Sequence, residues 1–224
     1  MSVLRMRWRD ALFAHWPVAP SVVDERLPDG LEADTFDGRA WLGVVGFRME
    51  DIRPRGCPVG LTFPELNLRT YVRGGEKDGI YFFNLDADDR LGVAVARRAF
   101  RLPYYYAAMR HERRGRAVRL RSRRLHPGVP SLGFEGTYGP VGGRVEDRAL
   151  ADFLTERYRF YTANDDGRLF AGDVVHDPWP LRPGYLTTGR NDCFTANGFE
   201  HPDGDPLVHY SPGVDVGAGR LRRV

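Results

Sequence analysis

The sequence predicts an α+β domain in which antiparallel β-sheet predominates. Short apolar or alternating segments, typical of strands, recur along the chain, and turn-forming combinations of Gly and Pro separate them. Only a few segments have the periodicity of a helix. The 26 glycines and 16 prolines are spread throughout rather than gathered into a linker, and no repeat is visible. We therefore expect a single domain over residues 1–224.

The first expected elements are a short helix and a buried strand. Residues 8–16, WRDALFAHW, are interpreted as the helix. Residues 40–49, AWLGVVGFRM, are nearly all apolar, as in a strand that is buried on both faces.

The next strand, residues 65–72 (ELNLRTYV), alternates between polar and apolar residues. Glu65, Asn67, Arg69 and Tyr71 share one face, because side chains two apart in a strand point the same way. On pattern alone, this polar face is expected to meet solvent. Residues 79–86 follow as another strand after the glycine-rich loop RGGEKDG, which predicts a hairpin.

The remaining elements are two helices and three strands. A helix is expected over residues 91–100, ending before Leu102-Pro103, because proline disfavours helix in the residue before it. A longer helix is expected over residues 146–162, with acidic residues in its first turn and an apolar stripe. The predicted strands are 116–125, 132–139 and 207–216.

Composition limits the chemistry. Lys77 is the one lysine among 33 basic residues, and arginine stays protonated, so it cannot serve as an amine nucleophile. No apolar run approaches the ~20 residues of a membrane-spanning helix. Cys57 and Cys193 lack metal-ligand or disulfide spacing, and the six histidines form no metal motif. We expect a cytoplasmic protein with no metal, no cofactor and no membrane partner.

Several segments resemble the YqjF-like family of uncharacterised proteins, which is similar to a branch of the acetoacetate decarboxylase-like superfamily. The resemblance implies a mainly antiparallel, cone-shaped β-barrel with a few short helices and a central cavity. The segments run through nearly the whole chain and are HWPV (15–18), LPDGLEADTFDGRAWLGVVGFRM (27–49), PELNLRTYV (64–72), GIYFFNLDA (79–87), RRAFRLPYYYAAM (97–109), FLTERYRFY (153–161), HDPWPL (176–181) and LVHYSPGVDV (207–216).

The decarboxylases of this superfamily carry the signature G-R-E-x-x-G-[FYW]-P-K-K, which falls on residues 96–105. Arg97 and Pro103 agree with it, whereas Arg98 replaces the glutamate and Tyr104 and Tyr105 replace both lysines. Decarboxylation in that superfamily needs a lysine amine with a lowered pKa, which forms a Schiff base with the keto acid. A tyrosine cannot form an imine, and Lys77 lies in the RGGEKDG loop, where we expect it to be solvated. The resemblance thus implies an inherited pocket without its Schiff-base lysine.

The resemblance also supplies candidate site residues, because it places the polar face of residues 65–72 in the cavity. A phenol can exchange protons or stabilise an enolate-like oxygen, and an arginine can clamp a carboxylate. The alternatives are that the tyrosines only fill the barrel wall and that Glu65 and Arg69 form a structural ion pair. The catalytic candidates are Glu65, Tyr104 and Tyr105, and the ligand-binding candidates are Asn67, Arg69, Arg97, Arg98 and Tyr106.

Three functions remain open. The leading hypothesis is a barrel that binds a small organic acid or keto compound, and the second is a lysine-independent lyase, hydratase or isomerase that uses Tyr/Glu acid–base chemistry. The third is nucleic-acid or protein interaction through the arginine stripe at 110–124, in which Arg119, Arg121 and Arg123 share a strand face. No aromatic stacking platform accompanies that stripe, which weighs against nucleic acid. The resemblance leaves a homo-oligomer open, since related decarboxylases assemble into oligomers.

Overall fold

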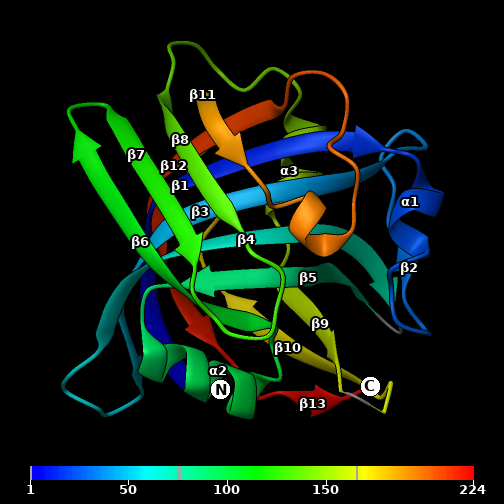
Figure 1. Cartoon of the computed structure of the whole chain (residues 1–224), viewed down its shortest axis with the longest axis vertical. Helices are drawn as coiled ribbons and strands as arrows, with labels where there is room; N and C mark the ends of the chain where they lie inside the picture. The colour runs from blue at the N-terminus through cyan, green and yellow to red at the C-terminus, as the bar shows by residue number, and fades with distance from the viewer. Residues whose placement is uncertain (1, 75–76, 165) are drawn as a thin grey trace.

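The structure, a computed structural model, describes residues 2–74, 77–164 and 166–224 and is mainly β (Figure 1). The helices are α1 (Pro20–Asp24), α2 (Arg90–Phe100), α3 (Arg148–Thr155) and the 3-10 turn η1 (Thr195–Asn197). The strands are β1 (Leu4–Val18), β2 (Glu32–Ala33), β3 (Ala40–Pro54), β4 (Leu61–Gly74), β5 (Lys77–Ala87), β6 (Tyr104–Arg114), β7 (Ala117–Arg124), β8 (Gly133–Pro140), β9 (Arg159–Ala163), β10 (Leu169–Val175), β11 (Arg182–Asn191), β12 (Leu207–Ala218) and β13 (Arg222–Arg223).

Hydrogen-bonded pairing closes the sheet into two rings that share a wall. One ring runs β5-β6-β7-β8-β11-β12-β1-β3-β4 and closes through the β4–β5 pair. The other runs β4-β5-β9-β10-β12-β1-β3 and closes through the β10–β12 pair. Most pairs are antiparallel, but β5 pairs in parallel with β6 and β9. The fold is therefore a closed barrel of mixed, mostly antiparallel strands. The predicted fold class, a mainly antiparallel β-barrel with a few short helices, is confirmed.

The first ring is packed solid, and we call it the filled ring. Its interior holds a cluster of side chains with almost no exposure, among them Leu12, Leu66, Leu120, Phe134 and Tyr138. Cores of this kind reach the packing density of organic crystals.

The second ring uses the opposite face of the shared strands, and we call it the hollow ring. On β4, Leu66 and Leu68 point into the filled ring, while Glu65, Asn67 and Arg69 point into the hollow ring. The period of two along a strand produces this division. The polar face of residues 65–72 thus lies in the interior, as the resemblance implied, and not against solvent.

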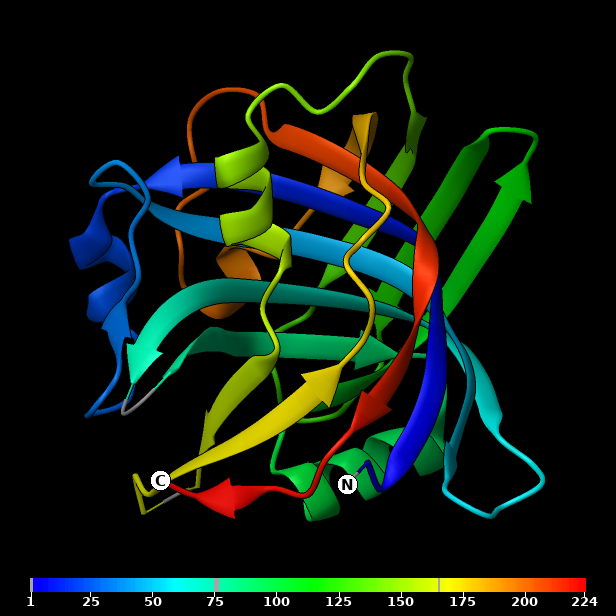
Figure 2. The same cartoon turned by 180° about the vertical axis from the view of Figure 1, so that it is seen from behind.

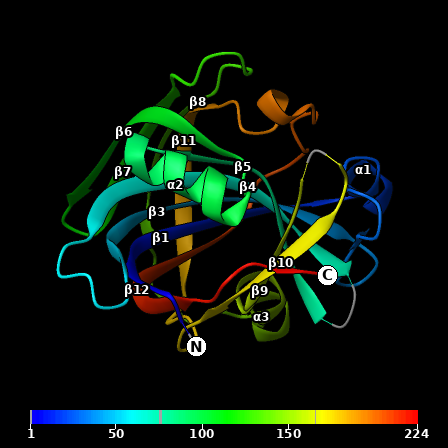
Figure 3. The same cartoon turned by 90° about the horizontal axis from the view of Figure 1, so that it is seen from below.

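Helices cover the hollow ring at two places. Helix α2 lies across the lower end of the barrel, as the view from below shows (Figure 3). Helix α3 lies on the side seen in Figure 2, where the Tyr71 hydroxyl donates to the carbonyl of Leu154 at 2.6 Å. No helix in the described residues is long and apolar enough to cross a membrane.

Most predicted elements are confirmed, and two helices are corrected. Residues 8–16 lie in strand β1, not in a helix, because β1 pairs along its length with β3 and β12 and is buried on both faces. The predicted helix over 146–162 ends at Thr155, and Arg159–Ala163 forms β9 because it pairs with β10 and β5. The hairpin predicted from RGGEKDG includes residues 75 and 76, which lie outside the described residues.

Candidate ligand-binding cavity

A cavity of about 410 Å³ lies inside the hollow ring. Its wall is mostly apolar and is built from β1, β3, β4, β5, β9, β10, β12 and one face of α2. Val59, Leu91 and Val95 line it and are nevertheless 74%, 62% and 51% exposed. These three residues, from the β3–β4 hairpin and α2, therefore mark its mouth.

A hydrogen-bonded group of polar side chains lies in the wall away from the mouth. The Tyr104 hydroxyl donates to Glu65 Oε2 at 2.6 Å, and Asn67 Nδ2 donates to Glu65 Oε1 at 3.2 Å. Glu65 and Asn67 are each 2% exposed, and Tyr104 is 8% exposed. Tyr104 reaches this place because it is the first residue of β6, which pairs there with Leu85 of β5. We call Glu65, Asn67, Arg69 and Tyr104 the polar end of the cavity.

Burial raises the pKa values of Glu65 and Tyr104 at the polar end. It raises the pKa of Glu65 to about 7, although hydrogen bonds from Tyr104 and Asn67 and the positive charge of Arg69 act against the rise. Burial and the neighbouring carboxyl of Glu65 raise the pKa of Tyr104 well above its ordinary value. Tyr104 therefore remains a protonated donor at neutral pH, while Glu65 can exchange protons there.

Arg69 is held by neutral partners. Its Nη2 donates to the carbonyl of Leu154 at 3.1 Å, and the Tyr71 hydroxyl lies 3.5 Å from the same atom. Tyr71 in turn contacts His15 Nε2 at 2.6 Å, and burial lowers the pKa of His15 well below its ordinary value. His15 is thus neutral and donates to the tyrosine, whose own proton goes to Leu154.

Among the ion pairs of the described residues, none joins Arg69 to a carboxylate. The alternative in which Glu65 and Arg69 form an ion pair is therefore wrong. The guanidinium of Arg69 is hydrogen-bonded to neutral groups, and burial favours the neutral form of the Glu65 carboxyl. By contrast, Arg157 and Arg159 also line the cavity but pair with Asp34 and Asp173, each at 2.8 Å.

Three buried polar atoms of cavity-lining residues have no hydrogen-bond partner. They are Asn67 Oδ1, Arg69 Nε and Trp8 Nε1. Leaving a buried polar atom unpaired costs about 1–3 kcal/mol, and folded proteins hold few of them. An acceptor and two donors of residues in the cavity wall therefore lack hydrogen-bond partners among the described residues, although these three atoms are themselves buried.

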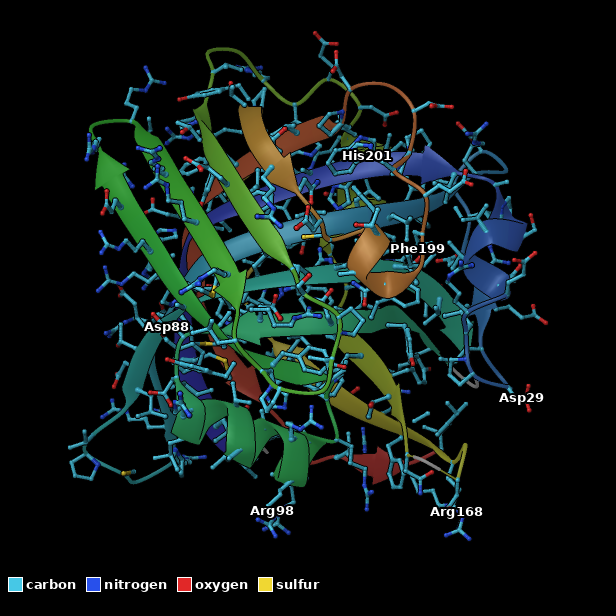
Figure 4. The ribbon with its side chains drawn as sticks, viewed as in Figure 1. Asp29, Asp88, Arg98, Arg168, Phe199 and His201 are labelled. Atoms are coloured by element: carbon cyan, nitrogen blue, oxygen red, sulfur yellow. The ribbon has the colours of Figure 1, made fainter. Side chains whose placement is uncertain are left out.

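Four of the predicted site residues lie outside the cavity. Tyr105 points to the other face of β6, as the alternation of a strand requires. There the guanidinium carbon of Arg124 lies 4.4 Å from the centroid of the Tyr105 ring. Tyr106 is half-buried below Arg90, which lies 4.3 Å from its ring. Arg97 donates to the carbonyl of Tyr104 at 2.9 Å, and Arg98 is exposed and points away from the barrel (Figure 4).

The position of both arginines follows from the helix. Helix α2 runs to Phe100 and is followed by the left-handed Arg101, so Arg97 and Arg98 sit in its last turn and not on an extended segment. Basic residues in that turn interact favourably with the helix dipole. The candidate site therefore comprises the polar end and does not include Tyr105, Tyr106, Arg97 and Arg98.

Lys77 is exposed at the start of β5, and it is not among the described residues that line the cavity. Several lining residues were not predicted, notably Trp8, Arg157, His176 and Trp179. The indole rings of Trp8 and Trp179 stack with centroids 5.8 Å apart. They come from distant segments, so no local pattern in the sequence could have linked them to Glu65.

The arginine stripe lies on the outside of the barrel. Arg119 and Arg121 both donate to Glu135 Oε1, at 2.6 and 2.8 Å, while Arg123 is exposed. Arg124 points inward instead and pairs with Asp86 at 2.9 Å. Within the described residues no cluster of His, Cys, Asp and Glu is arranged to hold a metal ion.

Comparisons with known proteins agree with this architecture. The model of the family DUF2071, described as an uncharacterized conserved protein, matches residues 5–215. The uncharacterized protein YqjF of Bacillus subtilis (strain 168) is 41% identical over 226 residues, covering 99% of this chain and 92% of YqjF.

Solved structures show a similar fold at low identity. Acetoacetate decarboxylase from Legionella pneumophila superposes with a TM-score of 0.69 at 13% identity, over 99% of this chain and 87% of the other. The enduracididine biosynthesis enzyme MppR, complexed with pyruvate, gives 0.66 at 14% identity over 100% and 91%. An acetoacetate decarboxylase-like enzyme from Sphingomonas wittichii RW1 gives 0.64 at 15% identity over 100% and 94%.

Proposed function

Because the chain belongs to the DUF2071 family and has the acetoacetate decarboxylase-like fold, we propose that its cavity binds a small organic acid or keto compound without a Schiff base. One observation carries the proposal: Arg69 is buried in the cavity wall, and among the described residues it has no carboxylate partner and its Nε has no hydrogen-bond acceptor.

The charge at the polar end favours an anion. Arg69 brings a guanidinium charge to the polar end, whereas the neighbouring Glu65, with a pKa of about 7, is largely neutral at slightly acid pH. A buried charge without a partner is strongly unfavourable. A carboxylate ligand would supply the missing negative charge and an acceptor for Arg69 Nε.

A carbonyl group would complete the other contacts. Tyr104 donates to Glu65, and the phenol can also donate to a carbonyl oxygen that replaces this partner. MppR has been solved with pyruvate, which carries both a carboxylate and a ketone. That structure supports a keto acid as the first ligand to try here.

The test is calorimetric titration with 2-keto and 3-keto acids at pH 6.5. Wild type should bind, and Arg69→Met should lose at least tenfold in affinity, since a charge-assisted hydrogen bond contributes about 1.5–3 kcal/mol. The matched control is Arg98→Met, which removes an exposed guanidinium outside the cavity and should leave binding unchanged. Equal affinities in wild type and Arg69→Met would contradict the proposal.

A second function, acid–base catalysis, is favoured by the 2.6 Å contact between Tyr104 and Glu65. With a pKa of about 7, ionised Glu65 can take a proton from the carbon beside a ketone, while Tyr104 donates to the enolate-like oxygen. Returning the proton to the opposite face of the same carbon inverts that carbon, and in an unsaturated ketone returning it to the far end of the conjugated system shifts the double bond, so either isomerisation needs no external reagent.

Proton exchange measures this directly. In D₂O, the NMR signal of the C–H beside the ketone of a bound keto acid should disappear faster with wild type than without protein. Glu65→Gln should abolish the acceleration while the acid still binds. An acceleration that persists in Glu65→Gln would rule out Glu65 as the base, and no acceleration in wild type would leave the protein as a binder only.

A further inference from the structure

The polar end is a small part of the cavity. Along β4 the lining changes from Leu61 and Phe63 near the mouth to Glu65, Asn67 and Arg69. At ~3.3 Å per residue, the step from Leu61 to Phe63 spans about 7 Å and that from Glu65 to Arg69 about 13 Å. The neighbouring strand β3 stays apolar along the same course, with Met49 opposite Phe63, Phe47 opposite Glu65 and Val45 opposite Asn67.

The mouth is apolar too. Leu91 and Val95 lie four residues apart on α2 and so on one face of the helix, and both are exposed. Val59 faces the same opening from the β3–β4 hairpin. The apolar wall therefore continues from the polar end to the surface at α2, while on the β3–β4 hairpin Arg53 also lines the cavity and donates to the carbonyls of Cys57 and Pro58.

The volume exceeds what a three-carbon acid fills. At about 30 Å³ for each water-sized group in a liquid, 410 Å³ holds about 14 such groups. A three-carbon keto acid has only six non-hydrogen atoms. The rest of the space would be an apolar void or disordered water, and neither gains contacts with the wall.

Building on the proposed function, we propose that the ligand is an amphipathic aliphatic acid with an unbranched chain of about ten carbons. Its carboxylate lies at Arg69 and Tyr104, and its chain runs past Phe63 and Met49 to leave between Val59, Leu91 and Val95. A 3-keto group on such a chain would remain near Tyr104. The apolar wall thus selects chain length, and the polar end selects the acid.

The test is calorimetric titration with butyrate, hexanoate, octanoate and decanoate, and with decan-1-ol. Each added CH₂ buries apolar surface worth about 0.8 kcal/mol, so affinity should rise about fourfold per carbon until the chain reaches the mouth. Decan-1-ol should bind more weakly than decanoate by at least tenfold, because it lacks the carboxylate to which Arg69 donates a charge-assisted hydrogen bond.

Two variants on the exposed face of α2 locate the chain. Val95→Asp places a charge at the mouth and should reduce decanoate affinity by about tenfold, while butyrate binding stays unchanged. Ala94→Asp is the matched control, since Ala94 is exposed on the same helix but does not line the cavity. Both positions are at the surface, so the fold should tolerate both changes.

The outcomes separate the two proposals. Affinity that is independent of chain length, or equal losses in Val95→Asp and Ala94→Asp, would overturn the aliphatic chain and leave short-acid binding standing. Failure of every acid to bind wild type would overturn the proposed function and this inference together.

Discussion

The filled ring and the hollow ring share strands β1, β3, β4, β5 and β12, yet a buried arginine of the first and a buried arginine of the second have different partners. In the filled ring, Arg124 Nε lies 2.9 Å from Asp86 Oδ1, and both side chains are at most 2% exposed. In the hollow ring, Arg69 and Glu65 are buried but do not pair with each other. The filled ring therefore holds a buried ion pair, whereas Arg69 and Glu65 have no ionic partner among the described residues. The other two arginines of the cavity wall, Arg157 and Arg159, do pair with carboxylates.

The difference separates structural polar groups from candidate binding groups. Asp86 and Arg124 pair with each other within a packed interior, although Asp86 Oδ2 and Arg124 Nη2 have no further partner among the described residues. Burial raises the pKa of Asp86 to about 6, because it outweighs the attraction of Arg124. Glu65 and Arg69 instead line open space. Burial alone therefore does not identify a site, whereas burial beside a cavity with unused donors and acceptors does.

The largest expected effect comes from breaking the completed pair. Arg124→Met leaves the Asp86 carboxyl buried without its partner, and we expect the free energy of unfolding at pH 7.5 to fall by about 3–5 kcal/mol. Arg69→Met should change it by less than about 1 kcal/mol, because no carboxylate depends on Arg69. Urea unfolding measures both.

The double variant Asp86→Asn, Arg124→Met is the control for this comparison. It removes the stranded carboxylate and should recover most of the lost stability. If Arg69→Met were as destabilising as Arg124→Met, the distinction between the two rings would fail.

A second comparison tests packing. Leu66 is fully buried in the filled ring, and Leu66→Ala should cost about 3 kcal/mol because it opens a new cavity. Leu85 is 2% exposed and already borders the open cavity, so Leu85→Ala removes fewer contacts and should cost about 1–2 kcal/mol. The midpoint of urea unfolding at constant slope measures the difference, and equal costs would show that the hollow ring is packed as tightly as the filled one.

Alternation made the fold largely predictable from sequence. Residues 65–72 read as a two-faced strand, and 40–49 read as a strand buried on both sides. Residues 8–16 were misinterpreted because both faces of β1 are buried, so polar and apolar residues do not alternate, and the left-handed Asp10 (φ 51°) interrupts the pairing register. A short apolar run of this kind has no periodicity that separates strand from helix.

The candidate site was only partly predictable. The pattern of residues 65–72 indicated a polar face but not whether it meets solvent or the interior. Only the family resemblance predicted that it lines the cavity. Arg97 and Arg98 were included because they adjoin Tyr104 in sequence, but α2 carries them to its outer surface. Trp8 and Trp179 meet at the cavity only through pairing of distant strands and loops. Proximity in sequence was therefore a poor guide wherever a helix ends and a strand begins.

A further expected effect depends on pH and concerns the protonation of Glu65. Its pKa of about 7 in the folded protein exceeds the ordinary value of 4.5, so the folded state favours the protonated form. The resulting stabilisation is complete below pH 4.5 and is lost as the pH rises through 7. Wild type should therefore lose roughly 2 kcal/mol relative to Glu65→Gln between pH 5 and pH 7, measured by urea unfolding at each pH.

Tyr104→Phe refines this measurement. Its hydroxyl donates to Glu65 Oε2, and this hydrogen bond holds the pKa of Glu65 below the value that burial alone would give. Without the donor, the pKa should rise further, so the loss of stability should move to higher pH. A pH profile in Glu65→Gln that matches wild type would show that Glu65 does not titrate in this range. The polar end would then lack the proton exchange on which the catalytic hypothesis depends, while acid binding at Arg69 would be unaffected.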